Sequence, residues 1–239
     1  MTHVKNVQAF GKLTGICTGY GGQYNPGKQN LQVKAMATLW TKAQQAMEAV
    51  NEAKSLYDIA TNDRVRGFYG LRKLSSSVIA LLKMSGAHEL TIQDAVTNNR
   101  KIWGTRKANR KANAEIQADE VKRKSTFVYS QDYASIANYF AQIVETISKE
   151  PKYQPNEPHM SVEGLQKKVK ELHQLNNAVT AAEIRLKQAK RDRDELYYKV
   201  EGNLFETALA AKLYVRGIFG YQSSQHLEVR SLRFTKPHF

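Results

Sequence analysis

The residues best suited to bind another molecule are the arginines and lysines between positions 100 and 124. Nine basic residues stand there against three acidic ones. If this segment is helical, its repeated Arg-Lys-Ala-Asn places Arg106 one turn from Arg110. Positive charge gathered in this way binds phosphate groups, with an affinity that falls steeply as the salt concentration rises. The predicted contact residues for a polyanion or another partner are Arg106, Lys107, Arg110, Lys111, Lys122, Arg123 and Lys124.

Two other interpretations of this basic segment stay open. It can be a solvated linker, or a patch that docks on an acidic surface of another subunit. Trp103 stands beside the segment and is a candidate for a surface contact, whereas Trp40 adjoins apolar residues and is expected to pack in a core. The sequence has no recognised nucleic-acid motif, so the charge indicates polyanion binding in general terms.

Side-chain groupings typical of catalysis or metal binding are not found in the sequence. The six histidines are scattered without a partner at ligand spacing, and the single cysteine, Cys17, excludes a cysteine-based zinc site. We expect Cys17 to be a buried thiol at the end of a short helix. The glycines from Gly19 to Gly22 fit no phosphate-binding fingerprint and predict a loop. The prediction is therefore a protein that is not an enzyme, with no cofactor, metal or small-molecule ligand.

Arg64 and Arg193 each take a position that is otherwise apolar in a seven-residue spacing. A buried charge is costly unless it is paired, and a polar residue in an apolar seam commonly fixes the register of the packed helices. We interpret both as register-setting residues, with salt bridges across the bundle as one way to satisfy them. The alternative is that their stems lie along the seam edge and leave the guanidinium groups in water.

The elements that must position these residues are helices. An interior proline costs a helix about 3 kcal/mol, and good helix formers fill the two long proline-free stretches, 27–150 and 159–236. Strict alternation of apolar and polar residues is scarce, so strands are not predicted. The prolines stand at two punctuation points and near the C-terminus: Pro26, Pro151, Pro155, Pro158 and Pro237.

Two apolar seams with seven-residue spacing predict long helices that pack at shallow angles, as in a coiled coil or bundle. A helix of roughly 40 residues would be about 60 Å long, so we expect an elongated molecule. Gly67 and Gly70 lie inside the first seam, where they permit a kink or the close packing of a neighbour. The seams are Met36, Ala43, Val50, Tyr57 and Leu71, and Leu165, Leu172, Val179, Leu186 and Val200.

The two halves of the sequence also match each other, which predicts a tandem duplication. A shift of 129 residues places Tyr24 on Tyr153. An aromatic-led short helix precedes this tyrosine in each half, and Ser130 is a plausible cap for the second of these helices. Each half is predicted as short helix, Tyr-x-Pro turn, long helix and short helix. Further aligned pairs are Pro26 with Pro155, Arg64 with Arg193, Tyr69 with Tyr198 and, after one extra residue, Leu74 with Leu204.

Three stretches carry a resemblance to a known group of proteins: Ile16–Pro26, Tyr153–Glu157, and Tyr214–Gly220 with Leu232–Pro237. In these stretches the chain resembles an uncharacterised family of internally duplicated helical proteins from Bacteroidota. The resemblance covers nearly the whole chain. It implies a duplicated helical fold and supplies no activity, ligand or catalytic residue.

These observations predict an all-α fold: an elongated, pseudo-symmetric bundle of long antiparallel helices built from two tandem helical repeats. The repeats are expected at 1–103 and 130–239, packed as one domain, with a basic connector at 104–129. The net charge of +14 also favours an anionic partner. The predicted function is a non-enzymatic structural or scaffold protein that self-assembles. The alternative is a polyanion or nucleic-acid binding protein that uses the basic connector.

The sequence contains no segment that predicts membrane insertion or secretion. Its best apolar run, Ser75–Leu82, ends at Lys83 and is shorter than the roughly 18 residues that a membrane span needs. Residues 1–10 lack the apolar core of a signal peptide. We therefore predict a cytoplasmic location.

Overall fold

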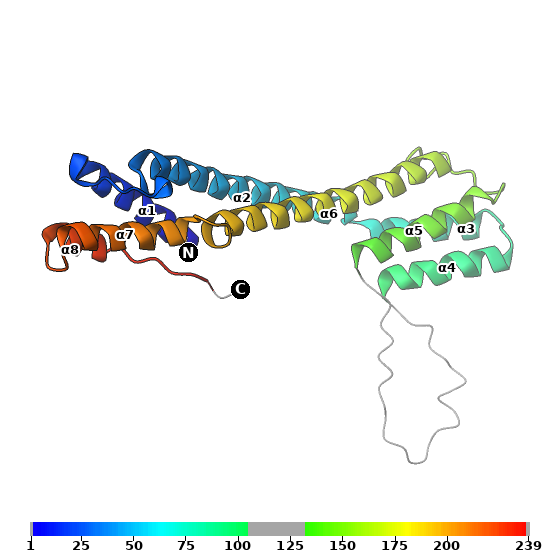
Figure 1. The fold of residues 1–239 in the computed structure, drawn as a ribbon. Helices are drawn as coiled ribbons and strands as arrows, with labels where there is room; N and C mark the ends of the chain where they lie inside the picture. Colours follow the sequence, from blue (N-terminus) through cyan, green and yellow to red (C-terminus); the bar gives the residue numbers. More distant parts are fainter. Residues whose placement is uncertain (1, 105–131, 238–239) are drawn as a thin grey trace, which may run out of the picture. The chain divides into compact units, whose positions relative to one another are not determined.

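The computed structural model describes residues 2–104 and 132–237, and every regular element in these ranges is a helix (Figure 1). The predicted all-α class is therefore confirmed. Two 3-10 turns, η1 (Gly21–Gln23) and η2 (Gln29–Leu31), lie between the first two helices. The helices are α1 (Thr2–Gly19), α2 (Val33–Phe68), α3 (Leu71–Met84), α4 (Glu89–Trp103), α5 (Tyr133–Ser148), α6 (Val162–Tyr198), α7 (Leu204–Phe219) and α8 (Ser224–Arg230).

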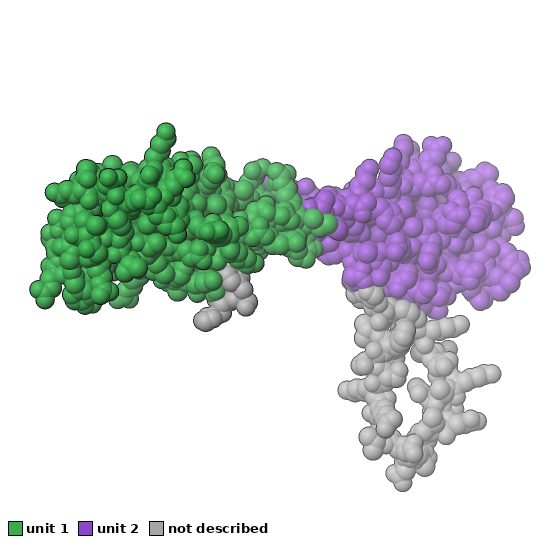
Figure 2. Space-filling view, in the orientation of Figure 1, with its two compact units in different colours: residues 1–58, 182–239 green, residues 59–181 purple. Residues whose placement is uncertain are grey.

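The chain divides into two compact units, coloured separately in Figure 2. Unit 1 contains residues 1–58 and 182–239, and unit 2 contains residues 59–181. These boundaries differ from the ones predicted for the repeats, because each unit combines helices from both predicted repeats. The two long helices, α2 and α6, each contribute residues to both units.

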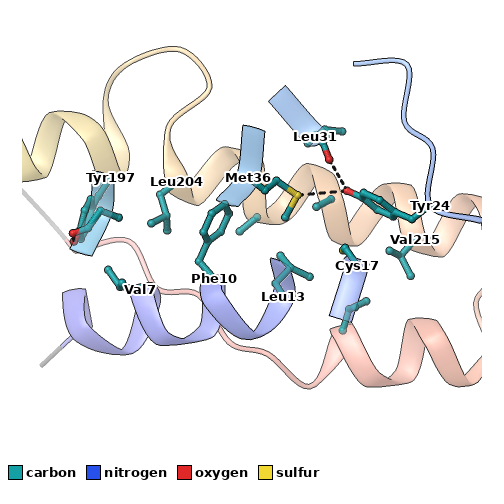
Figure 3. Close-up of a cluster of buried hydrophobic side chains, with 14 of the residues drawn as sticks. Val7, Phe10, Leu13, Cys17, Tyr24, Leu31, Met36, Tyr197, Leu204 and Val215 are labelled. Carbon is teal, nitrogen blue, oxygen red and sulfur yellow. Dashed lines mark hydrogen bonds between the residues drawn. The ribbon is translucent and has the colours of Figure 1, made fainter. Parts of the chain in front are cut away.

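The core of unit 1 forms where α1 packs with the start of α2, the end of α6, and α7 (Figure 3). Phe10, Leu13 and Cys17 recur at helical spacing and are fully buried, which places one face of α1 in this core. Trp40 packs against the same core as expected, and the absence of a side chain at Gly11 makes room for its indole ring.

The core of unit 2 is built from α3, α4 and α5 together with the start of α6. Phe140, Ile143 and Ile147 form the buried face of α5, with none of the three exposed to solvent. Leu165 and Leu172 of the predicted second seam are also fully buried in this core. Apolar seam residues are therefore buried in both units, with Met36 and Ala43 in the core of unit 1.

The long helices end earlier than the seams predicted. Gly70 has a φ of 79°, a left-handed conformation that favours glycine, and it separates α2 from α3. Leu71 therefore belongs to α3. In the second half α6 ends at Tyr198, and Val200, predicted as a seam residue, is 46% exposed beyond it. The lengths of α2 and α6 are 36 and 37 residues.

The N-terminus of α5 also differs from the prediction. Ser130 was the expected cap, but α5 begins at Tyr133 and its N-cap is Asp132. A carboxylate oxygen of Asp132 accepts a hydrogen bond from the backbone N–H of Ser135 at 2.9 Å. Aspartate satisfies a free first-turn amide as well as serine does, and it also interacts favourably with the helix dipole.

Candidate functional site

The predicted partner-contact residues of the basic connector all lie in 105–131, outside the described residues. Arg100 and Lys101, which precede the basic connector in the sequence, are described in the last turn of α4. The Lys101 ammonium nitrogen lies 5.3 Å from the centre of the Tyr139 ring and donates a hydrogen bond to Asn98 at 3.2 Å. The last turn of α4 therefore carries two positive charges just before the basic connector in the sequence.

Arg64, one of the two predicted register-setting residues, contacts an aromatic ring in unit 2. Its guanidinium carbon lies 4.3 Å from the centre of the Tyr133 ring, a cation–π distance. The Tyr133 ring also meets Phe68 edge to face at 4.8 Å. The Nε atom of Arg64 is buried and has no hydrogen-bond partner among the described residues. The charge of Arg64 is thus held against an aromatic face.

Arg193, the other predicted register-setting residue, is held by the neighbouring carboxylate in unit 1. Its side chain is 11% exposed and donates two hydrogen bonds to Asp194, at 2.7 and 2.9 Å. This ion pair joins successive residues of α6 and does not cross between helices. Burial, and then the charge of Arg193, lower the pKa of the adjacent His3. Arg64 and Arg193 therefore have different surroundings, and their role in setting register stays a prediction.

An open pocket of about 560 Å³ lies in unit 2, where the ends of α2 and α4 meet the starts of α3 and α5. Its volume is within the range of roughly 300 to 1,000 Å³ that small-molecule sites occupy. We call it the α2–α5 pocket. It is lined by Val65, Phe68, Tyr69, Gly70, Leu71, Arg72, Lys73, Trp103, Tyr133 and Ile136.

Aromatic rings form much of the α2–α5 pocket. Tyr69 follows the last residue of α2, and its side chain is 89% exposed, so its ring is open to a ligand. Trp103 is 44% exposed, and its indole N–H donates to Ser76 Oγ at 3.0 Å. This bond uses the only donor of the indole and fixes its orientation, so Trp103 can contact a ligand only through its ring.

The α2–α5 pocket is positively charged. Arg72 and Lys73, in the first turn of α3, are the charged side chains among the described lining residues, and none of those residues is a carboxylate. The guanidinium carbon of Arg72 lies 5.8 Å from the Trp103 ring centre. No side chain caps the start of α3, whose backbone amides add a partial positive charge.

Two carboxylates close in sequence to pocket residues have partners of their own. Asp63 accepts a hydrogen bond from Arg66 at 2.8 Å, and Asp132 caps α5. The lining of the pocket combines flat apolar surfaces with the positive charges of Arg72 and Lys73. This combination suits a ligand that has both an aromatic ring and negative charge.

The single thiol is in no position to react with a ligand. Cys17 is buried in the core of unit 1, as expected, and burial raises its pKa to about 11. The thiolate is the nucleophilic form of cysteine, so Cys17 is unreactive near neutral pH. No cluster of three or more metal-binding side chains occurs in the described part of the chain.

Among the described residues that line the pocket, the sequence predicts a surface contact for Trp103 alone. Tyr69 was aligned with Tyr198, yet Tyr198 is only 3% exposed and the two tyrosines have opposite environments. The signal available in the sequence was a break in the first apolar seam, where Tyr69 and Gly70 precede Arg72 and Lys73. A break of this kind exposes an aromatic ring beside two cations.

No family model, curated protein or solved structure matches this chain. Within the described ranges, no helix has the combination of length and apolar character needed to cross a bilayer.

Proposed function

We propose that this protein is a non-enzymatic polyanion-binding protein whose ligand is a nucleic acid. The observation that carries the proposal is the α2–α5 pocket, where the cations Arg72 and Lys73 line the same space as exposed aromatic rings. Phosphate attracts the cations and a base offers a flat face to the rings. This geometry favours the function that the sequence ranked second over the scaffold function that it ranked first.

The charge distribution along the chain gives the same proposal independent support. The basic connector follows α4 in sequence, directly after the pocket residue Trp103, and contains all seven predicted contact residues. Cations that follow each other along a chain can contact successive phosphates of one strand. Under this proposal the pocket and the basic connector bind the same molecule.

The test is binding of a fluorescently labelled oligonucleotide, measured by anisotropy over a series of salt concentrations. We expect log affinity to fall linearly with log salt, with a slope of about −0.7 for each phosphate contact on a single strand. Heparin should compete. A protein that fails to bind either polyanion at about 50 mM salt, where such contacts are strongest, would not be a nucleic-acid binding protein.

Self-assembly is a second candidate function, favoured by exposed apolar residues on α7. Leu209 and Leu213 lie one helical turn apart and are 46% and 65% exposed. The proposed occupant of this surface is a second copy of the chain. Light scattering should then give a particle mass above 27.1 kDa, and Leu213→Glu should return it to that value. A monomeric wild-type protein at high salt, where repulsion between basic copies is screened, would exclude self-assembly.

We also propose that the chain is a tandem duplication with pseudo-symmetric halves. The strongest support is one shared hydrogen bond: Tyr24 and Tyr153 each donate to the carbonyl seven residues later, Leu31 and Met160, both at 2.9 Å. In chain order, each predicted repeat also contains a short helix, a long helix and two further helices: α1 to α4 in the first and α5 to α8 in the second. The starts of α3 and α7 would pair Leu71 with Leu204, three residues from the predicted pairing of Leu74 with Leu204.

A further inference from the structure

We infer that the α2–α5 pocket accepts an unstacked base of a single-stranded nucleic acid, which makes the protein selective for single strands over duplexes. The inference rests on the proposed function and specifies its substrate. It concerns only described residues of unit 2: Tyr69, Arg72, Lys73, Trp103 and Tyr133.

The first argument is the accessibility of the rings. Tyr69 exposes 89% of its side chain and Trp103 exposes 44%, and both line one pocket. Stacking on a ring requires access to the face of a base, and in a duplex both faces are covered by neighbouring base pairs. A single strand exposes the faces of its bases at little cost in free energy. The pocket therefore favours a strand whose bases are free.

The second argument is that two of the rings are held in place before a ligand arrives. The indole of Trp103 is fixed through Ser76 Oγ at 3.0 Å, and the Tyr133 ring is fixed by Phe68 and Arg64. Rings that are already ordered lose little conformational entropy on binding, so more of the stacking free energy contributes to affinity. This arrangement is typical of a binding surface.

The third argument concerns the position of the charge. Arg72 and Lys73 follow Gly70 in the first turn of α3 and line the same pocket as the rings. A nucleotide carries its phosphate several ångströms from its base. A base among the rings would therefore leave its phosphate beside these two cations, at the positive end of the α3 dipole.

We expect this pocket to bind bases by stacking, without selecting a particular base. The lining offers ring faces and cations, and the indole donor of Trp103 is already engaged with Ser76. Every base has a π face, whereas discrimination between bases needs hydrogen bonds to their edges. We expect binding that tolerates many sequences.

The experiment compares three labelled oligonucleotides of equal length: a single strand, the corresponding duplex, and an abasic strand that keeps the phosphates and lacks the bases. The single strand should bind at least about fivefold tighter than the abasic strand, the lower end of what base stacking contributes. A mononucleotide is the fourth ligand. It should bind more weakly than the strand, and equal affinity would overturn the assignment to a nucleic-acid strand.

Variants locate the binding in the pocket. Tyr69→Ala and Trp103→Ala should each weaken single-strand binding by at least about fivefold, while Tyr69→Phe keeps the ring and should bind normally. Lys73→Gln should weaken binding more than Lys34→Gln, a matched removal of an exposed charge in unit 1. Circular dichroism checks that each variant is folded.

A spectroscopic measurement tests the pocket without changing any of its residues. The chain has two tryptophans, so Trp40→Phe leaves Trp103 as the only indole. Its fluorescence should be quenched by the single strand and much less by the abasic strand.

The inference is overturned if the abasic strand binds equally well, or if the pocket variants bind like wild type. If only glutamine substitutions in the basic connector abolish binding, the proposed function stands and the assignment to the pocket is wrong. If the wild-type protein does not bind, both the proposed function and the assignment to the pocket are wrong.

Discussion

Gly164 lies so close to Pro158 that a Cβ atom at position 164 would be 2.2 Å from the Pro158 carbonyl oxygen. The same carbonyl accepts a hydrogen bond from Ser161 Oγ at 2.9 Å, and Ser161 Oγ in turn accepts from the Gly164 N–H at 3.1 Å. The backbone of the turn before α6 therefore packs directly against the backbone of the first turn of α6.

We predict that Gly164→Ala destabilises the protein by about 1 to 3 kcal/mol, because backbone atoms must move to admit the methyl group. The matched control is Gly15→Ala in α1, where the added Cβ would meet no atom within 4 Å. There the better helix propensity of alanine should stabilise by up to about 1 kcal/mol. Urea denaturation measures both changes, and a stabilising Gly164→Ala would contradict the packing.

Leu172→Ala should lower the unfolding free energy by about 2 to 5 kcal/mol, since Leu172 is fully buried in the core of unit 2 and the change leaves a cavity. Val200→Ala is the control, because Val200 is 46% exposed and lies beyond the end of α6. Its effect should stay within about 0.5 kcal/mol. Equal effects of the two changes would mean that the seam is misassigned.

The paired tyrosine hydrogen bonds give a third prediction. Tyr24→Phe and Tyr153→Phe each remove one hydroxyl from a residue that is 5% exposed. Each change takes the donor away from a carbonyl, which is buried at Leu31 and partly buried at Met160. Each change should cost about 1 to 3 kcal/mol, and the two costs should be similar. Thermal or urea unfolding compares them. Very different costs would count against a duplicated turn.

A fourth prediction concerns alkaline pH. Burial raises the pKa of Cys17 from 9.0 to about 11, so the thiol stays neutral in the folded state while it ionises in the unfolded state. This contribution to stability is complete below pH 9.0 and is lost as the pH rises through about 11. Cys17→Ala should therefore show a shallower decline of unfolding free energy over that interval than wild type. Identical slopes would mean that the thiol ionises normally in the folded protein.

The all-α class and most buried seam residues could be predicted because helical periodicity is a local property of the sequence. Leu165 and Leu172 repeat with the spacing that places them on one face, and burial follows from that spacing. The break at Gly70 was not predicted, since a glycine in a seam is equally compatible with a kink, with close packing, or with the left-handed turn that forms here.

The α2–α5 pocket depends on tertiary structure. Its aromatic residues Tyr69, Trp103 and Tyr133 come from three places in the chain, and only the packing of four helix ends brings them together. Trp103 could be recognised as a surface contact because it adjoins the basic connector. The exposed ring of Tyr69 could not, since its position in the repeat matched a tyrosine that is buried.

The last prediction separates the basic connector from the total charge of the protein. Changing Arg106, Lys107, Arg110 and Lys111 together to glutamine removes four positive charges and keeps good helix formers, so stability should change little. If these residues contact phosphates, affinity for a strand should fall and the salt slope should flatten by up to about 0.7 for each lost contact. If they instead dock on a neighbouring subunit, the variant should stay folded and lose its larger particles.

The matched control removes the same charge from exposed lysines in unit 1: Lys12, Lys28, Lys34 and Lys42, each changed to glutamine. Both variants have the same net charge, so any general attraction of a basic protein to a polyanion falls equally in the two. A larger loss of strand affinity and a flatter salt slope in the connector variant alone would assign the phosphate contacts to the basic connector. Equal losses in the two variants would show that the connector acts only through net charge, and unchanged binding together with unchanged particle mass would leave it as a solvated linker.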